Sequence, residues 1–267
     1  MDQRADQAVA VRRDGPVVTL LLDRPERRNP LGLATMTSLR ERLRAAGDDP
    51  SVRAVVLGAT GTVFSAGHDL RELRDADAAA TRRIFDACAE LMLAIHGLPV
   101  PVIARVPGLA TAAGCQLVAA CDLAVAAEGA RFATPGVRIG LFCTTPAVEV
   151  IRAVGRTRAM EMLLTGDPID APTALAWGLV NRVVPAAELD AAARGLAERI
   201  VGASRATVAA GKRAVAGLAE LPLEQAYPLA SAAMCRDAGT PSAREGIDAF
   251  LGKRDPVWPD APAGSGT

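Results

Sequence analysis

A run of small residues in the middle of the chain is the feature that most constrains its fold. From residue 110 to residue 120 the side chains are mostly small or apolar and none is charged. Such a composition suits a helix that is buried on all sides, because a surface helix needs a polar face. An apolar run at 102–106 precedes it and predicts a strand, which Pro107 and Gly108 end. We therefore expect a buried helix that follows directly on a strand.

Strand patterns alternate with helical patterns over most of the chain. The expected strands cover residues 17–22, 52–57, 102–106, 122–126 and 181–184. The expected helices cover residues 35–46, 81–96, 110–120, 146–154, 158–164 and 172–177, the first of them with Thr35 as its N-cap. From 187 to 251 the pattern is almost purely helical. This order predicts an α/β core in residues 1–195 and a helical C-terminal module in residues 196–267, with residues 259–267 disordered.

The charge balance and the cysteines restrict the partners and the compartment. Thirty basic and thirty acidic residues cancel, so no overall field favours nucleic acid or an acidic membrane surface. No stretch approaches the roughly 18 apolar residues of a membrane span, and the first residues lack the apolar run of a secretory signal. Five cysteines without a CxxC pair or a metal-ligand rhythm fit reduced thiols, so we expect a cytoplasmic protein without a metal site.

Two segments contain residues suited to bind a negatively charged oxygen. In the first, FSAGHDL at 64–70, a strand is followed by a glycine turn and a charged helix start, which exposes backbone N–H groups. In the second, VPGLATAAGCQL at 106–117, small side chains let a ligand approach the backbone near a helix start. Each segment also has a plain interpretation: a turn glycine in the first and close helix packing in the second.

Together, the two segments resemble the signature of the crotonase (enoyl-CoA hydratase/isomerase) superfamily. FSAGHDL is followed by PVPVIARVPGLATAAGCQLVAACDLAVAAEGARFATPGVRIGL, as in that family. The opening LDRPERRNPL, the later LLTGDPIDAPTALAWGLVNRVVP and the closing EGIDAFLGKRDPVW fit the same pattern. The resemblance extends over residues 17–258, and it is specific because several separated motifs occur in the right order.

This resemblance implies a fold, an assembly and a ligand. The fold is a spiral of ββα units with a helical C-terminal trimerisation module, and trimers often pair into hexamers. The ligand is an acyl-CoA thioester, so coenzyme A enters as part of the substrate and no covalently bound cofactor is implied. The backbone amides of His68 and Ala113 would form an oxyanion hole for the thioester carbonyl.

The resemblance also implies contacts to coenzyme A. The matching positions are Arg24, Arg28, Ala66, Asp69, Leu70, Phe250 and Lys253. The last two match residues that often reach the ligand of a neighbouring subunit. The arginines and Lys253 have a second interpretation as ordinary solvated surface charges.

The sequence departs from the hydratases at both acid/base positions. Their two catalytic glutamates fall at Gln116 and Gly136 in this chain. A glutamine cannot take a proton at neutral pH, and a glycine has no side chain. Loss of one acid/base group typically costs about 10²- to 10⁴-fold in rate, so efficient hydration by a glutamate pair is not expected.

Other residues near these motifs are candidates for the missing chemistry. His68 titrates near neutrality, and a similar histidine occurs in decarboxylating relatives that act on malonyl-type thioesters. The alternative is that His68 turns to solvent. Thr144 lies where some isomerase relatives place an acid and could position a water molecule. Cys143 could line the acyl pocket, although a small apolar role suits it better.

Three further polar residues are expected to act structurally. Glu149 should face away from the site on the following helix, and Asp122 should brace or cap the buried helix. His96, in the last turn of a helix, should interact with the helix dipole.

These observations leave three functions open. The favoured one is a lyase- or isomerase-type enzyme of acyl-CoA or fatty-acid metabolism that works through the oxyanion hole. The second is a non-catalytic acyl-CoA binding or carrier protein, and the third, the weakest, is a purely structural protein.

Overall fold

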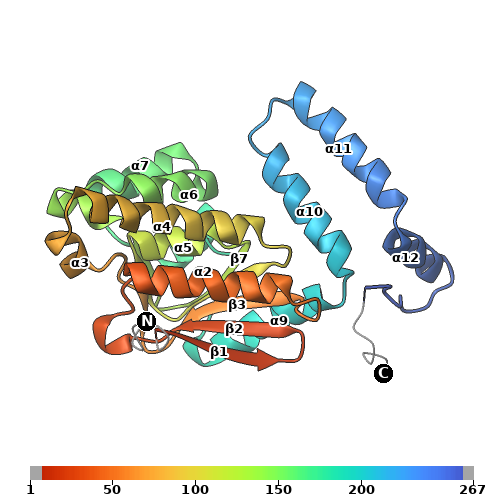
Figure 1. Ribbon diagram of the computed structural model, residues 1–267, viewed down its shortest axis with the longest axis horizontal. Coiled ribbons are helices and arrows are strands. Elements are labelled where there is room, and N and C mark those ends of the chain that lie inside the picture. Colours follow the sequence, from red (N-terminus) through yellow and green to blue (C-terminus); the bar gives the residue numbers. More distant parts are fainter. Residues whose placement is uncertain (1–7, 261–267) are drawn as a thin grey trace.

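The computed structural model describes residues 8–260, which form two β-sheets and the helices around them (Figure 1). The larger sheet contains β1 (Val9–Asp14), β2 (Val17–Leu22), β3 (Ala54–Ala59), β5 (Val102–Val106), β7 (Leu123–Ala127) and β10 (Arg182–Val184), in that spatial order. The smaller sheet contains β4 (Val63–Ser65), β6 (Leu109–Thr111), β8 (Arg131–Ala133) and β9 (Ile169–Asp170). Only β1 and β9 run antiparallel to their neighbours.

The larger sheet is covered on both faces, which explains the almost continuous apolar character of its inner strands. One face packs against α2 (Leu33–Asp48), α4 (Ala78–Gly97) and α5 (Ala113–Ala120), with Leu20 and Leu57 in the shared core. The other face packs against α9 (Leu189–Val201), where Val56 and Ala193 belong to a second apolar cluster. The predicted buried helix is therefore real, although it is shorter than expected because residues 109–111 form β6.

Along the described part of the chain, seven further helices and 3₁₀ turns precede the C-terminal helices and surround the core. They are the 3₁₀ turns at Pro25–Arg27, Pro135–Ile139 and Ala186–Glu188, and the α-helices α3 (Leu70–Asp75), α6 (Thr144–Val154), α7 (Arg156–Thr165) and α8 (Ala171–Trp177). None of the helices within residues 8–260 combines the length and the apolar character needed to cross a bilayer.

Two details at the start of α2 differ from the prediction. The helix begins at Leu33 with Gly32 as its N-cap, so Thr35 is not the cap and is instead buried in the first turn. The Leu33 amide donates to the Glu72 carboxylate at 3.0 Å. A carboxylate from α3 thus replaces the local side-chain cap that the sequence suggested.

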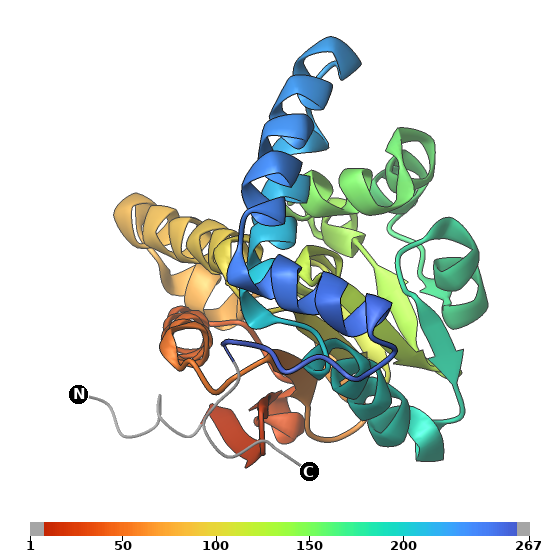
Figure 2. The ribbon, with the colours of Figure 1, turned by 90° about the vertical axis from the view of Figure 1, so that its right-hand side faces the viewer.

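The C-terminal helices α10 (Arg205–Leu218), α11 (Leu223–Ala238) and α12 (Pro241–Leu251) form an arm beside the core. In both views α11 extends beyond the core (Figures 1 and 2). The predicted boundary between residues 195 and 196 falls inside α9, which packs on the sheet along its length. The arm itself begins with α10 at Arg205, and the division of the chain into a core and a C-terminal module stays a prediction.

Lys212 joins this arm to the core. Its ammonium group donates to the carbonyl oxygens of Ile95 at 2.9 Å and Val100 at 3.3 Å, and to the Asp122 carboxylate at 2.7 Å. Asp122 also accepts the Val102 amide at 2.8 Å, so it braces the end of the buried helix as expected. The Lys212 side chain is only 9% exposed.

We expect Lys212→Met to loosen the arm and lower the free energy of unfolding by about 3 kcal/mol. The substitution removes the three hydrogen bonds of an ammonium group that is only 9% exposed, and each is worth about 1 kcal/mol. Chemical denaturation and limited proteolysis of α10–α12 would measure both effects. Arg213→Met, at an exposed position on the same helix, is the matched control. Equal stability of the two variants would show that Lys212 does not anchor the arm.

The chain also folds back after α12. The Asp260 carboxylate accepts the Ala206 amide at 2.7 Å and the Ser204 hydroxyl at 3.2 Å, and the Asp260 carbonyl accepts from Arg53 at 2.9 Å. Residues 259 and 260 are therefore placed, contrary to the disorder predicted from residue 259. The rest of that predicted segment, 261–267, lies outside the described residues.

Candidate functional site

The two turns identified in the sequence lie in contact with each other. β4 pairs in parallel with β6, which aligns Ser65 with Ala110. A Cβ atom on Gly67 would lie 2.9 Å from Ala112 Cβ and 3.3 Å from the Ala113 nitrogen. A Cβ atom on Gly114 would lie 2.5 Å from the Ser65 carbonyl oxygen. Only glycine permits this close approach, and it brings the turn after β4 against the start of α5.

The amides of His68 and Ala113 are available for a ligand. Within residues 8–260, neither amide donates to a protein acceptor. Ala113 opens α5, where the first amides have no acceptor inside the helix. Ala112, just before it, has φ 52° and ψ −119°, a conformation that an alanine rarely adopts. Strain of this kind persists where the surrounding structure enforces it, and it often marks a functional turn.

Both amide-bearing residues line a pocket of about 430 Å³. Its wall is mostly apolar, with Leu70, Leu73, Phe85, Pro135, Ile139, Leu141, Phe142 and Pro146. The described residues that line it include no aspartate and no glutamate. A pocket of this size and character suits an acyl chain, with a few polar groups to orient it.

His68 contributes a buried, neutral imidazole to this pocket. Its Nδ1–H donates to the Leu31 carbonyl oxygen at 3.3 Å, and its ring lies edge-on to Phe85 with the ring centres 5.2 Å apart. Nε2 is buried without a protein partner among the described residues. Burial lowers the pKa of His68, so the ring is uncharged at neutral pH. The ring is thus not turned to solvent.

Gln116, which the sequence resemblance matches to the first hydratase glutamate, does not line the pocket. It is 3% exposed, and its Oε1 accepts from the Cys88 thiol, with 3.6 Å between oxygen and sulfur. Burial raises the pKa of Cys88 to about 12, which keeps that thiol protonated as a donor. The Gln116 and Cys88 side chains are therefore part of the buried interior and do not line the pocket.

Gly136, which the sequence resemblance matches to the second hydratase glutamate, lines the pocket, and its surroundings leave no room for a side chain. A Cβ atom there would lie 2.0 Å from the Leu141 carbonyl oxygen and 2.8 Å from Cys143 Sγ. The backbone closes this turn through hydrogen bonds from the Leu141 amide to the Gly136 oxygen at 3.0 Å and from the Gly136 amide to Cys143 Sγ at 3.3 Å. Leu141 and Cys143 therefore occupy the space that a side chain at position 136 would need.

Cys143 and Thr144 complete this wall. Burial raises the pKa of the Cys143 thiol, so it is a protonated, small apolar group rather than a nucleophile. Thr144 begins α6 and is exposed, and its hydroxyl lies 3.4 Å from the Phe142 carbonyl oxygen. No three His, Cys, Asp or Glu side chains in the described chain are grouped so that they could hold a metal.

The residues expected to contact coenzyme A fall into two groups. Ala66 and Leu70 line the pocket, and the Arg28 carbonyl accepts the Ala66 amide at 2.9 Å. Asp69 caps α3 and pairs with Arg27 at 2.7 Å. Arg24 lies at the start of the same loop, where its amide donates to Asn29.

The second group lies elsewhere. Phe250 lies in α12 and Lys253 follows that helix. Figure 1 shows α12 on the opposite side of the molecule from α3, whose Leu70 and Leu73 line the pocket. In one chain the structure therefore does not bring them to the candidate site.

Sequence reasoning missed a part-buried contact between His96 and Glu149. His96 Nε2 donates to Glu149 at 3.1 Å from each carboxylate oxygen. Glu149 does not line the pocket, in agreement with the expectation that it faces away. The partners are 53 residues apart, so no local pattern could indicate the contact. The hydrogen bond that His96 donates to Glu149 is the main cause of a raised pKa at His96. The charges of Glu149 and Asp122 raise this pKa further, whereas burial and the charge of Lys212 lower it.

This pair predicts a loss of stability as the pH rises. Because the pKa of His96 is raised above its ordinary value of 6.5, its contribution is complete below pH 6.5 and is lost as the pH passes the raised pKa. We expect the free energy of unfolding to fall with pH in this range more steeply for the natural chain than for Glu149→Gln. Urea denaturation at several pH values would test this; parallel profiles would contradict it.

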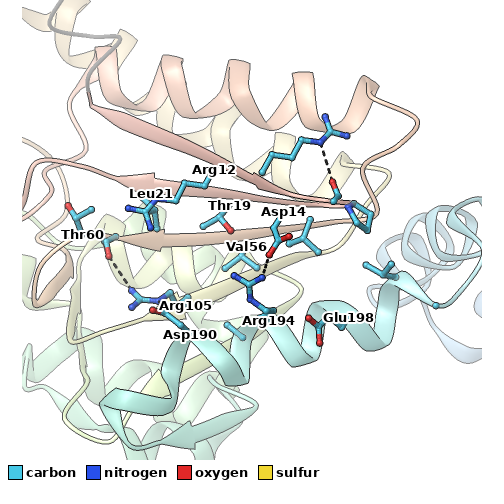
Figure 3. A pocket seen from close by; sticks show the side chains of 18 of the residues that line it. Arg12, Asp14, Thr19, Leu21, Val56, Thr60, Arg105, Asp190, Arg194 and Glu198 are labelled. Atoms are coloured by element: carbon cyan, nitrogen blue, oxygen red, sulfur yellow. Dashed lines mark hydrogen bonds and ion pairs between the residues drawn. The ribbon is translucent and has the colours of Figure 1, made fainter. Parts of the chain in front are cut away.

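A larger cavity, of about 1010 Å³, lies between the β1–β2 edge of the large sheet and α9 (Figure 3). Its charged side chains are largely paired with one another, Arg194 with Asp14 and Arg105 with Asp190. Figure 3 shows these pairs linking α9 to the strands. The two amide-bearing turns are not part of it, so the smaller pocket is the candidate site.

Two sheets around a common core, two unpaired amides beside an apolar pocket and a helical C-terminal arm define a protein of the crotonase class. The chain belongs to the enoyl-CoA hydratase/isomerase family, whose model matches residues 12–261. The resemblance seen in the motifs is thus confirmed, and with it the predicted fold class.

Within the family, the chain is similar to enoyl-CoA hydratase domain-containing protein 3. It is 45% identical to the mitochondrial protein of Mus musculus over 250 residues, which are 93% of this chain and 83% of the relative. The crystal structure of the human protein matches with a TM-score of 0.91 and 44% identity, over 94% of this chain and 100% of that one. An enoyl-CoA hydratase structure from Mycobacterium smegmatis matches with a TM-score of 0.91 and 48% identity, over 94% and 98%.

Proposed function

We propose that the protein binds an acyl-CoA thioester and acts on it by polarising the thioester carbonyl with the amides of His68 and Ala113. The observation that supports this most is the contact between the two turns, which leaves both amides without protein acceptors beside the pocket. Preorganised donors of this kind stabilise negative charge that develops on oxygen in the transition state. An enolate formed from the thioester is the intermediate that such a site would favour.

The proposed chemistry is of the lyase or isomerase type rather than two-glutamate hydration. The pocket wall has no carboxylate among the described residues, Gln116 is turned to Cys88, and Gly136 is closed by backbone. Decarboxylation fits this wall well. Breaking the C–C bond releases CO₂ without a base, the oxyanion hole stabilises the enolate that keeps the electron pair, and a water molecule then protonates the α-carbon. His68 lines the same pocket, and burial lowers its pKa, so its imidazole is uncharged at neutral pH.

The second candidate is a non-catalytic acyl-CoA carrier. The observation that favours it is the same absence of a carboxylate from the described pocket wall, combined with an intact pair of amides. Such a protein would bind thioesters and release them unchanged.

Turnover assays with the purified protein separate these functions. Crotonyl-CoA, a longer enoyl-CoA and methylmalonyl-CoA would be tested, while the dissociation constants of CoA and hexanoyl-CoA are measured by calorimetry. Turnover of methylmalonyl-CoA or isomerisation of an enoyl-CoA would support the enzyme. Thioester binding without any turnover would favour the carrier. Efficient hydration of crotonyl-CoA would contradict the proposal.

We further propose a homotrimer or a dimer of trimers. The arm exposes large apolar side chains, including Tyr227 on α11 and Phe250, which is 82% exposed. In such an assembly Phe250 and Lys253 would approach the coenzyme A of a neighbouring chain. Light scattering after gel filtration would test the assembly. The cytoplasmic location predicted from the sequence stays a prediction, and the named vertebrate relatives are mitochondrial proteins.

A further inference from the structure

Ser65 stands directly behind the turn that carries the His68 amide. It ends β4, is 0% exposed, and its hydroxyl makes two hydrogen bonds. The hydroxyl donates to the Asn29 carbonyl oxygen at 2.8 Å and accepts the Gly67 amide at 3.1 Å. This one side chain therefore connects the turn after β4 to a loop that is 36 residues earlier in the sequence.

Asn29 holds the other end of this connection. It is 1% exposed and has φ 51°, a left-handed conformation that asparagine tolerates better than most residues. Its Oδ1 accepts the Arg24 amide at 2.7 Å, and its Nδ2 donates to the carbonyl oxygens of Thr60 at 3.0 Å and Val63 at 2.8 Å. The loop that carries Arg24 and Arg28 is thus fixed to the segment that leads into β4.

These contacts fix the direction of the His68 N–H. Gly67 has φ +84°, a conformation that would be mobile in an isolated turn. Its amide is held by Ser65 Oγ, and its carbonyl accepts the Leu31 amide at 2.8 Å. Because a peptide unit is planar, the carbonyl of Gly67 and the amide of His68 point in opposite directions from one rigid plane. Holding both peptide units next to Gly67 therefore orients the His68 donor.

We propose that Ser65, supported by Asn29, is the positioning residue for the His68 amide. It links the loop of Arg24 and Arg28 to the oxyanion hole, so that the two regions keep one relative geometry. This inference rests on the proposed function, because it concerns the same amide. A hydrogen bond to a thioester oxygen weakens steeply with misalignment, so the effect should fall on the carbonyl rather than on coenzyme A.

The test uses Ser65→Ala and hexanoyl-CoA labelled with ¹³C at its carbonyl. This saturated thioester reports polarisation of the carbonyl as a downfield shift of the bound ¹³C signal. We expect the natural chain to produce this shift and the variant to reduce it. The affinity for hexanoyl-CoA should fall by about twofold to tenfold, the value of one ordinary hydrogen bond, while the affinity for free CoA stays unchanged.

Ser204→Ala is the matched control. Ser204 is equally buried, at 1% exposed, and its hydroxyl makes three contacts, with the Ser242 hydroxyl at 3.0 Å, with Asp260 at 3.2 Å and with the Thr207 amide at 3.3 Å. It caps the first helix of the C-terminal arm, so a general loss of stability should appear in both variants and the loss of the ¹³C shift only in the first. If Ser65→Ala does not fold, Ser65→Cys preserves the volume with a weaker hydrogen-bonding group and serves in its place.

The outcomes separate the two levels of inference. A full ¹³C shift and unchanged thioester affinity in the Ser65 variant would overturn the positioning role while leaving the proposed function intact. No downfield shift in the natural chain would overturn the proposed oxyanion hole itself. Equal losses of affinity for CoA and hexanoyl-CoA would assign Ser65 to general loop structure instead.

Discussion

Placing glutamates at the two positions that the sequence resemblance assigns to the hydratase pair, as Gln116→Glu with Gly136→Glu, is expected to yield an unstable protein without efficient hydratase activity. At Gly136 the first side-chain atom alone would lie 2.0 Å from the Leu141 carbonyl oxygen, which is backbone and cannot turn aside. Overpacking of this kind costs about 3 kcal/mol or more of unfolding free energy. At Gln116 a carboxylate would be buried beside the Cys88 thiol, away from the pocket, so it would take up a proton rather than activate water.

Chemical denaturation and crotonyl-CoA hydration would be measured for the double variant and for each single one. Gly129→Glu is the control for the added side chain, because a Cβ atom at Gly129 meets nothing within 4 Å. We expect Gly129→Glu to keep the natural stability and Gly136→Glu to lose it. Hydration by the double variant at the rate of a two-glutamate enzyme, without loss of stability, would refute the conclusion that Gly136 has no room for a side chain and that position 116 is turned away from the pocket.

Gly67→Ala is expected to abolish the function of the oxyanion hole. The new Cβ atom would lie 2.9 Å from both Ala112 Cβ and the Thr111 carbonyl oxygen, and φ +84° adds strain of about 1–2 kcal/mol. The two turns must then separate, which moves the His68 amide away from that of Ala113. Removal of one donor from an oxyanion hole typically slows turnover by about 10²- to 10³-fold, and we expect a loss of at least this size.

The control for this variant is Gly15→Ala. Gly15 has φ +54° in the β1–β2 turn, and a Cβ atom there meets nothing within 4 Å. It therefore carries a similar backbone strain without the collision, far from the site. Turnover, the bound ¹³C carbonyl signal and the free energy of unfolding should be compared in the two variants. If Gly15→Ala and Gly67→Ala lose equal activity, the contact between the turns is not what sustains the site.

The parts of the fold that sequence predicted correctly are those governed by local chemistry. β2 and β5 are apolar runs ended by proline or glycine, and the structure places both at the expected residues. The helical pattern from residue 187 to residue 251 is equally clear, and it corresponds to α9, α10, α11 and α12. The sequence does not predict β1, because apolar and polar residues do not alternate in VAVRRD and most of the strand is exposed. The strands β4, β6 and β8 have three residues each, which is too short to show the two-residue period of a strand.

The candidate site divides in the same way. The two turns could be found because glycine and alanine at fixed positions serve a local backbone requirement. The closure at Gly136 could not, since it depends on where the Leu141 carbonyl lies in space. The links from Ser65 to Asn29 and from His96 to Glu149 join residues 36 and 53 positions apart, and nothing in their neighbourhoods encodes the partner.

The pocket wall has one further consequence, for the interpretation of pH profiles. Above the lowered pKa of His68 and below the raised pKa of Cys143, neither of these side chains changes charge. The turnover rate measured from neutral to mildly alkaline pH should then depend on the ionisation of the substrate. The fraction of folded protein, which falls as His96 loses its proton, has to be measured separately and the rate corrected for it. The charge of His68 and Cys143 in the pocket wall would thus stay constant over this pH range, so a pH dependence of turnover would report the ionisation of the thioester that is tested.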